Sequence, residues 1–346
     1  MRLQRVAAIG PWTIIGTRIV SVAAALVAGG IAFALLGYDV LDLAGTVVSA
    51  SLGSLFGLED LGLLFSPLIL TGLAAAVALR IGLWNIGGEG QFYAGCIAAT
   101  VTGLNLDGPT FVMLPLMAVA GFAGGAAWVL IPALARAWLA IDEIITTLLL
   151  NFVAVLLVNY LCTGPMRDQS QAVTSATARI PYEIPPLFDD LHAGLLVAIA
   201  AVIVMALLFA YTQWGYQVRL AGSNRHAARY AGIGVRRRLL QVMLLSGGLA
   251  GLAGMLEVVG TVHRLQGGIS NNYGYLGIMI AVLAGGVPIA VLPAALLMAL
   301  ILNGSTVLQA YGVSSYEVLA LTGLVLLFTA MGERLAYYRL PRRVAP

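Results

Sequence analysis

The sequence predicts an all-α membrane protein that crosses the bilayer many times. Its 346 residues are 60% hydrophobic and only 10% charged, whereas a soluble domain carries about 25% charged residues. The apolar residues also form long runs without a charge, of 25 residues from Phe111 to Ala135 and of 52 from Leu265 to Tyr316. A helix that spans a bilayer needs roughly 20 such residues. This composition cannot cover a water-exposed surface, which excludes a large soluble domain with buried helices.

Ten segments qualify as membrane-spanning helices. They cover about residues 15–37, 63–82, 89–105, 111–135, 143–162, 191–212, 239–260, 271–285, 288–309 and 316–332. The third and the eighth are short, so we expect each to be broken or tilted. Arg2 and Arg5 precede the first run, as in a signal peptide. That run is long and has no clear small-residue cleavage site, so we interpret it as a retained first span.

Arginine placement predicts the orientation of these spans. Fourteen of the eighteen basic residues lie at the N-terminus, at Arg136, in the 213–238 loop or in the C-terminal tail. Basic loops stay on the cytoplasmic side. Ten spans put all four segments there, with both termini cytoplasmic. The other side receives acidic loops and the polar, proline-containing stretch 163–190, which we expect to be an external loop.

Several chemistries are excluded or disfavoured by residues that are missing. Every basic residue other than histidine is arginine, and a phosphate-binding loop of the GxxxxGK[ST] type needs a lysine. Any ATP hydrolysed through such a loop would therefore be bound, with Mg²⁺, by another chain. Cys96 and Cys162 fall in predicted spans without metal-ligand spacing. The three histidines are scattered and there is no GxSxG motif, so we expect neither an enzyme nor a bound metal or cofactor.

The most polar interruption of the apolar pattern lies between the second and third spans. The run from Gly82 to Gln91 contains Trp84, Asn85, Glu89 and Gln91. Irregular backbone at membrane depth is tolerated where it is buried in protein or lines a cavity, and a charge there should face the interior. Two interpretations remain. Either Asn85, Glu89 and Gln91 line a substrate path, or Glu89 accepts backbone N–H bonds that hold a re-entrant turn.

Three further residues are candidates for the substrate path. Asn151 lies within the fifth span, where an amide either joins helices or faces a polar ligand. Tyr160 follows on the same span. Glu257, near the outer end of the seventh span, either meets a polar substrate, pairs with Arg264 or lies at the membrane boundary. Small residues in the fourth and seventh spans predict close helix packing; they are Gly121, Gly124, Gly125, Gly247, Gly248, Gly251 and Gly254.

The loop 213–238 contains a short predicted helix from Asn224 to Ile233. Asn224 or Ser223 would cap its start, and Gly232 would end it in a left-handed conformation. A helix this short is unstable alone and should dock on something. Its surface mixes small and basic side chains, namely Arg225, Ala227, Ala228 and Arg229. It suits either a groove on a partner protein or anionic lipid headgroups.

Together these segments resemble a bacterial ATP-binding-cassette importer permease of the simple sugar and nucleoside family. The residues that carry the resemblance are Leu83 to Gln91, with Trp84 where the family has phenylalanine, Asp142 to Asn151, Arg219 to Asn224, Ala227 to Ile233, and Ser246 to Gly260. The resemblance as a whole runs from about residue 10 to residue 335. More narrowly, the chain resembles the larger permease of nucleoside importers.

The resemblance implies a vitamin B12-importer-like fold with two inverted repeat halves, in a single permease domain of residues 1–346. It makes 224–233 the helix that couples to a cytoplasmic ATPase. It also implies a second, paralogous permease, an external solute-binding lipoprotein and a bacterial inner-membrane location. We therefore expect alternating-access import of nucleosides. Monosaccharides, branched-chain amino acids or autoinducers are the alternative solutes. An ion-coupled secondary transporter using Glu89 and Glu257 is the alternative mechanism.

Overall fold

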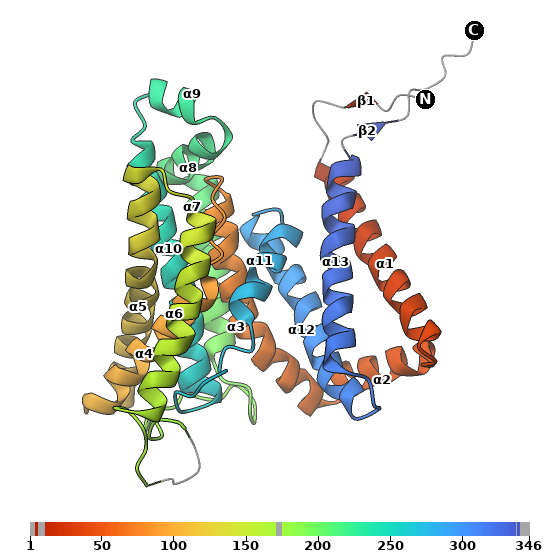
Figure 1. Cartoon of the computed structure of the whole chain (residues 1–346), viewed down its shortest axis with the longest axis horizontal. Helices are drawn as coiled ribbons and strands as arrows, with labels where there is room; N and C mark the ends of the chain where they lie inside the picture. The colour runs from red at the N-terminus through yellow and green to blue at the C-terminus, as the bar shows by residue number, and fades with distance from the viewer. Residues whose placement is uncertain (1–3, 6–10, 171–174, 337, 340–346) are drawn as a thin grey trace. The chain divides into compact units, whose positions relative to one another are not determined.

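The computed structural model describes residues 4–5, 11–170, 175–336 and 338–339. Within them the chain is almost entirely helical (Figure 1). The helices are α1 Pro11–Leu35, α2 Val40–Leu52, α3 Leu55–Leu79, α4 Gly88–Asn105, α5 Thr110–Leu139, α6 Glu143–Thr163, α7 Gly194–Tyr211, α8 Gln213–Ser223, α9 Arg225–Tyr230, α10 Val235–Leu256, α11 Tyr273–Leu283, α12 Val291–Gln309 and α13 Ser315–Ala336. A π-helix, Glu257–Thr261, extends α10, and a 3₁₀ turn, Pro288–Ala290, precedes α12.

The prediction of a polytopic membrane protein is confirmed. Eight helices in the described residues are long and apolar enough to cross a bilayer. The predicted third and eighth spans coincide with α4 and α11, which do not meet that criterion, so the count of ten spans and the importer-like topology stay predictions. The structure adds a helix, α2, where the sequence analysis placed a loop. Asp39 caps this helix by accepting hydrogen bonds from the backbone N–H groups of Leu41 and Asp42.

The contacts divide the chain into two compact units, residues 1–58 with 300–346, and residues 59–299. In the first unit α1 packs along α13, and Gly29 of α1 lies against Leu321 of α13. The strands β1 (Gln4–Arg5) and β2 (Tyr338–Arg339) pair antiparallel, with Gln4 opposite Arg339. The predicted cytoplasmic residues Arg2, Arg342 and Arg343 lie outside the described part of the chain.

In the second unit α10 is the central helix. It packs against α4 and α5. Of the most apolar stretch of this helix, 83% is buried inside the protein, whereas the buried share is 22% to 28% in α5, α6 and α7. The three outer helices therefore present most of their apolar surface outward, as expected for helices that face lipid. α7 has the highest mean hydropathy of the candidate spans and carries only apolar side chains apart from Tyr211.

Glycines bring α10 close to both of its neighbours, as the small-residue pattern predicted. A Cβ added to Gly251 would lie 2.8 Å from the backbone nitrogen of Gly125 on α5 and 2.9 Å from its Cα. Gly95 of α4 approaches the backbone of Gly251 more closely still. Because the neighbours are backbone atoms, no side-chain rotation would make room for a larger residue. These helices meet main chain to main chain.

The segment between α6 and α7, predicted as an external loop, packs on the chain that follows the π-helix. Ile180 N–H donates to the carbonyl of His263 at 2.8 Å, and Thr177 N–H donates to that of Leu265 at 3.0 Å. His192 closes the segment, with Nδ1 accepting from Gly194 N–H at 3.1 Å. The described parts of this loop are therefore held by hydrogen bonds to the same unit.

Candidate functional site

The polar interruption between α3 and α4 is a tight turn followed by a short non-helical segment. Helix α3 ends in a Schellman motif: Gly82 has a φ of +73°, its N–H donates to Leu79 O at 3.0 Å, and Leu83 N–H donates to Ala78 O at 3.2 Å. Glycine adopts this left-handed conformation without steric cost. The chain then runs without helix until α4 begins at Gly88. This geometry breaks the span and buries Leu83, Asn85 and Gly87, while Trp84 between them stays exposed.

Asn85 and Gln91 form a buried pair of amides. Asn85 Nδ2 donates to Gln91 Oε1, and Gln91 Nε2 donates back to Asn85 Oδ1, both at 2.8 Å. Asn85 Nδ2 also donates to Ser246 Oγ of α10 at 2.8 Å, and that hydroxyl donates to the carbonyl of Ala74 in α3 at 2.6 Å. The pair thus ties the broken span to two neighbouring helices, with its polar groups satisfied in a buried setting.

Glu89 joins the first turn of α4 to the start of α11. Its carboxylate is buried and accepts hydrogen bonds from Ser270 Oγ and, at 3.0 Å, from Gly274 N–H. The approach is close enough that a Cβ on Gly274 would collide with the backbone of Glu89. A carboxylate in the first turn of a helix is also favoured by the helix dipole. The two short helices therefore begin at one shared point.

Asn151 of α6 completes this cluster from the other side. Its Oδ1 accepts from Gly90 N–H at 2.9 Å, and its Nδ2 donates to the carbonyl of Ile86 at 2.8 Å and to Tyr275 Oη at 3.3 Å. Asn85, Glu89, Gln91, Asn151 and their partners Ser246, Ser270 and Gly274 are called the polar junction below. The junction connects α3, α4, α6, α10 and α11 through buried hydrogen bonds.

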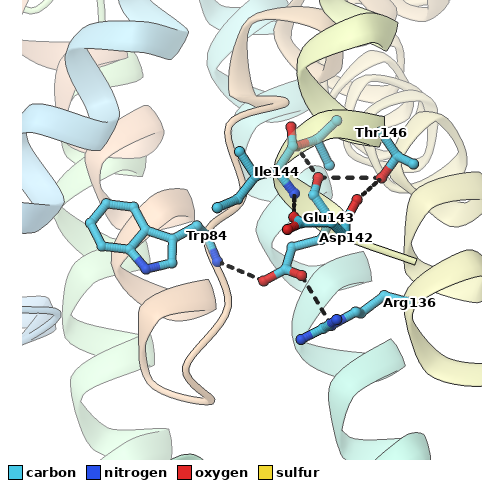
Figure 2. A network of polar contacts seen from close by, with 7 residues as sticks. Trp84, Arg136, Asp142, Glu143, Ile144 and Thr146 are labelled. Atoms are coloured by element: carbon cyan, nitrogen blue, oxygen red, sulfur yellow. Dashed lines mark hydrogen bonds and ion pairs between the residues drawn. The ribbon is translucent and has the colours of Figure 1, made fainter. Parts of the chain in front are cut away.

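Trp84 stands at the edge of the junction, next to an ion pair that the sequence analysis did not single out. Trp84 as a whole is 45% exposed. Its backbone N–H donates to Glu143 Oε1 at 3.3 Å, while Glu143 Oε2 pairs with Arg136 Nε at 3.0 Å (Figure 2). Glu143 follows Asp142, the N-cap of α6, and Arg136 lies in the last turn of α5. Each charge is favoured by its helix dipole.

The other two predicted path residues lie apart from the junction. Tyr160 is nine residues beyond Asn151 on α6, about 14 Å along the helix, and its ring is largely exposed. Glu257 is buried, but it starts the π-helix eleven residues beyond Ser246, about 16 Å along α10. The structure therefore gathers four of the seven predicted residues in one cluster. Among the described residues, no group of three histidines, cysteines or carboxylates is placed to hold a metal.

The predicted coupling helix forms within its expected range. Asn224 Oδ1 accepts from the backbone N–H groups of His226 and Ala227, each at 3.0 Å. Gly232 has a φ of +76° and ends the helix in a second Schellman motif, in which Ile233 N–H donates to Ala228 O. Ala228 is buried, whereas the side chain of Tyr230 is 98% exposed. Helices α8 and α9 lie at the end of this unit where α5 passes into α6 (Figure 1).

The long apolar helices and the span broken around buried polar groups define a polytopic membrane protein. Residues 57–330 match the family model described as branched-chain amino acid transport system / permease component. The chain belongs to this family, whose members are transport components rather than enzymes. No solved structure matches the chain.

Curated relatives align over most of the chain. It is 40% identical to the glucose ABC transporter permease protein TsgB13 of Haloferax volcanii, over 95% of this chain and 90% of the relative. It is 33% identical to the guanosine permease NupP of Bacillus subtilis, over 81% and 82% of the two chains. It is 32% identical to the nucleoside permease NupB of Lactococcus lactis, over 82% and 81%. A second permease of each bacterium, NupQ and NupC, matches at 26% and 28%.

Proposed function

We propose that this chain is the membrane-spanning subunit of an ATP-driven importer, with nucleosides as its solutes. Similarity over at least four-fifths of the chain to permeases named for guanosine and for nucleosides supports this proposal. Glucose is the second candidate solute, because the 40% identical relative is a glucose permease. Sugars and nucleosides share a ring that carries several hydroxyl groups, so one permease architecture suits both.

The proposed importer contains further chains. A cytoplasmic ATPase would bind ATP and Mg²⁺ and would dock on α9. An external solute-binding lipoprotein would deliver the solute. A paralogous second permease would complete the membrane core, because two different nucleoside permeases from one bacterium both match this chain. In this arrangement residues 1–346 act as one permease domain in the inner membrane, with both termini cytoplasmic.

Within this importer we assign the polar junction to the moving part of the solute path. Its amides and its carboxylate already have hydrogen-bond partners within the protein, so it would hold α4 against α11 rather than bind a solute. The exposed ring of Trp84, the ring of Tyr160 and the buried Glu257 are proposed to meet the solute. Tight binding by this chain is not required, since the lipoprotein supplies the affinity.

The experiment is solute uptake by proteoliposomes that contain this chain, its second permease and the ATPase. Nucleosides and glucose are compared with the cognate lipoprotein present. ATP-dependent uptake of a nucleoside supports the proposal. Uptake that is independent of ATP and is abolished by an ionophore would instead support an ion-coupled transporter. Asn85→Ala and Glu89→Gln, at normal protein level, should both slow uptake; unchanged uptake in both removes the junction from the mechanism.

A further inference from the structure

The turn after α3 touches the helix that carries α9. Gly222, next to the end of α8, faces this turn: a Cβ added there would lie 3.0 Å from the Cα of Ile81 and 3.1 Å from the carbonyl carbon of Arg80. Two residues later Asn224 ends α8 and caps α9. The contact is between backbones, and packed backbone cannot absorb a displacement by side-chain rotation. A displacement of α9 carried by α8 therefore reaches residues 80–83.

The same turn is held from another side by Glu143. Its two carboxylate oxygens have different partners, Trp84 N–H through Oε1 and Arg136 through Oε2. The Glu143 side chain is 6% exposed and that of Arg136 is 24% exposed. If the Arg136–Glu143 ion pair only stabilised the bend between α5 and α6, Glu143 would not need a hydrogen bond from Trp84, which lies 59 residues away in sequence. Figure 2 shows the carboxylate lying between the two.

The turn leads directly into the polar junction. Asn85 follows Trp84 and bonds to Gln91 and Ser246. Glu89, in the first turn of α4, bonds to the start of α11. The order of contacts is α9, α8, the turn at 80–84, the junction and α11. Each step is an observed contact within residues 59–299, the second compact unit.

We propose that residues 80–84 act as a lever between the ATPase docking helix and the shared start of α4 and α11, and that Glu143 is the positioning residue of this lever. Glu143 fixes the turn to α5 and α6, so that a push from α8 turns the segment toward the junction instead of displacing it as a whole. This inference rests on the proposed function. It assigns Glu143, Arg136 and Gly222 to the coupling between ATP hydrolysis and transport, and not to solute recognition.

The test measures solute molecules transported per ATP hydrolysed in the proteoliposomes described above. Glu143→Gln keeps the shape of the side chain and an acceptor for Trp84 N–H but loses the ion pair. Gly222→Ala places a methyl group against the backbone carbonyl of Arg80 and the Cα of Ile81. We expect each variant to lower the ratio by about fivefold or more, the lower end of ordinary coupling between sites. ATP hydrolysis should continue, because neither residue belongs to the proposed docking helix.

The matched control is Glu183→Gln. This carboxylate also pairs with an arginine, Arg179, at 2.7 Å, but its side chain is 53% exposed and it lies in the loop between α6 and α7. Its ratio should equal that of the unaltered chain. Arg136→Lys keeps the charge and should restore most of the ratio lost in Arg136→Ala. If Glu143→Gln does not fold, Gly222→Ala decides the question alone.

The outcomes separate this inference from the proposed function. A wild-type assembly that imports with ATP, combined with wild-type ratios in Glu143→Gln and Gly222→Ala, overturns the lever and leaves the importer intact. A wild-type assembly that shows no ATP-dependent uptake overturns the importer itself. A fall in transport that is matched by an equal fall in hydrolysis also counts against the lever, because the ratio would then be unchanged.

Discussion

The glycine contacts around α10 predict that one substitution has opposite effects at two helical positions. In an exposed helix interior, replacing glycine by alanine stabilises by about 1 kcal/mol, since alanine loses less backbone entropy on folding. A methyl group added at Gly323 of α13 would meet no neighbouring side chain or helix within 4 Å. Gly323→Ala should therefore be neutral or stabilise the protein by up to about 1 kcal/mol.

Gly251→Ala gains the same helix propensity but meets backbone. Its methyl group would lie 2.8 Å from Gly125 N and 2.9 Å from Gly125 Cα, with Gly121 O closer still. Two helices would have to separate, and overpacking of this kind costs about 1–3 kcal/mol. With the gain of about 1 kcal/mol set against the upper end of that cost, the net destabilisation is about 2 kcal/mol. The two variants should thus differ by about 2–3 kcal/mol.

The assay is thermal unfolding of the purified chain in one detergent, followed by tryptophan fluorescence. The unaltered protein and both variants are compared at equal concentration. Gly251→Ala should unfold at a lower temperature than the unaltered protein, and Gly323→Ala at the same temperature or higher. If Gly251→Ala is as stable as Gly323→Ala, then α5 and α10 are not in backbone contact and the reasoning is refuted.

Three further predictions concern single residues. Asn224→Ala should fray α9 at a cost of about 1 kcal/mol, seen as faster amide exchange in α9, whereas Ser223→Ala, whose hydroxyl bonds only within α8, should leave exchange unchanged. Ser246→Ala leaves one N–H of Asn85 without its partner and should cost about 1–3 kcal/mol in thermal unfolding; an unchanged unfolding temperature would contradict the network. Burial lowers the pKa of His192, which precedes α7, to about 4. Because the unfolded chain takes up this proton below about pH 6.5 and the folded chain does not, stability should be full above that pH and fall by at most about 3 kcal/mol toward pH 4. His192→Gln should flatten this fall, and an unchanged slope would show that another group is responsible.

Local signals in the sequence were sufficient for much of this structure. Each of the ten predicted segments coincides with a helix. A helix that spans a bilayer needs a long apolar run, and such a run can be recognised directly in the sequence. Asn224 and Gly232 were predictable since caps act on neighbouring residues. Helix α2 was missed because its 13 residues are too short for a span, although Asp39 before an apolar run was a usable start signal.

The partners of the polar residues were beyond the reach of such signals. Glu89 was predicted as a possible acceptor of backbone N–H groups, yet its partner Gly274 is 185 residues away. Glu143 was not predicted as a site residue because its role depends on a hydrogen bond from Trp84, which lies 59 residues earlier. Contacts of this kind are set by how the helices pack, and a single sequence carries no record of which helices become neighbours.

The close packing of α10 on α5 has a consequence for how the protein is made. Residues 140–234 separate the end of α5 from the start of α10, a distance of 95 residues. At synthesis rates of about 5–20 residues per second, synthesis of α10 begins about 5–20 seconds after α5 is complete. During that interval its glycine face meets lipid or the insertion machinery instead of backbone. Membrane insertion of the early helices therefore precedes their packing by seconds, and the ribosome, rather than the folding reaction, sets when the centre of this unit is assembled.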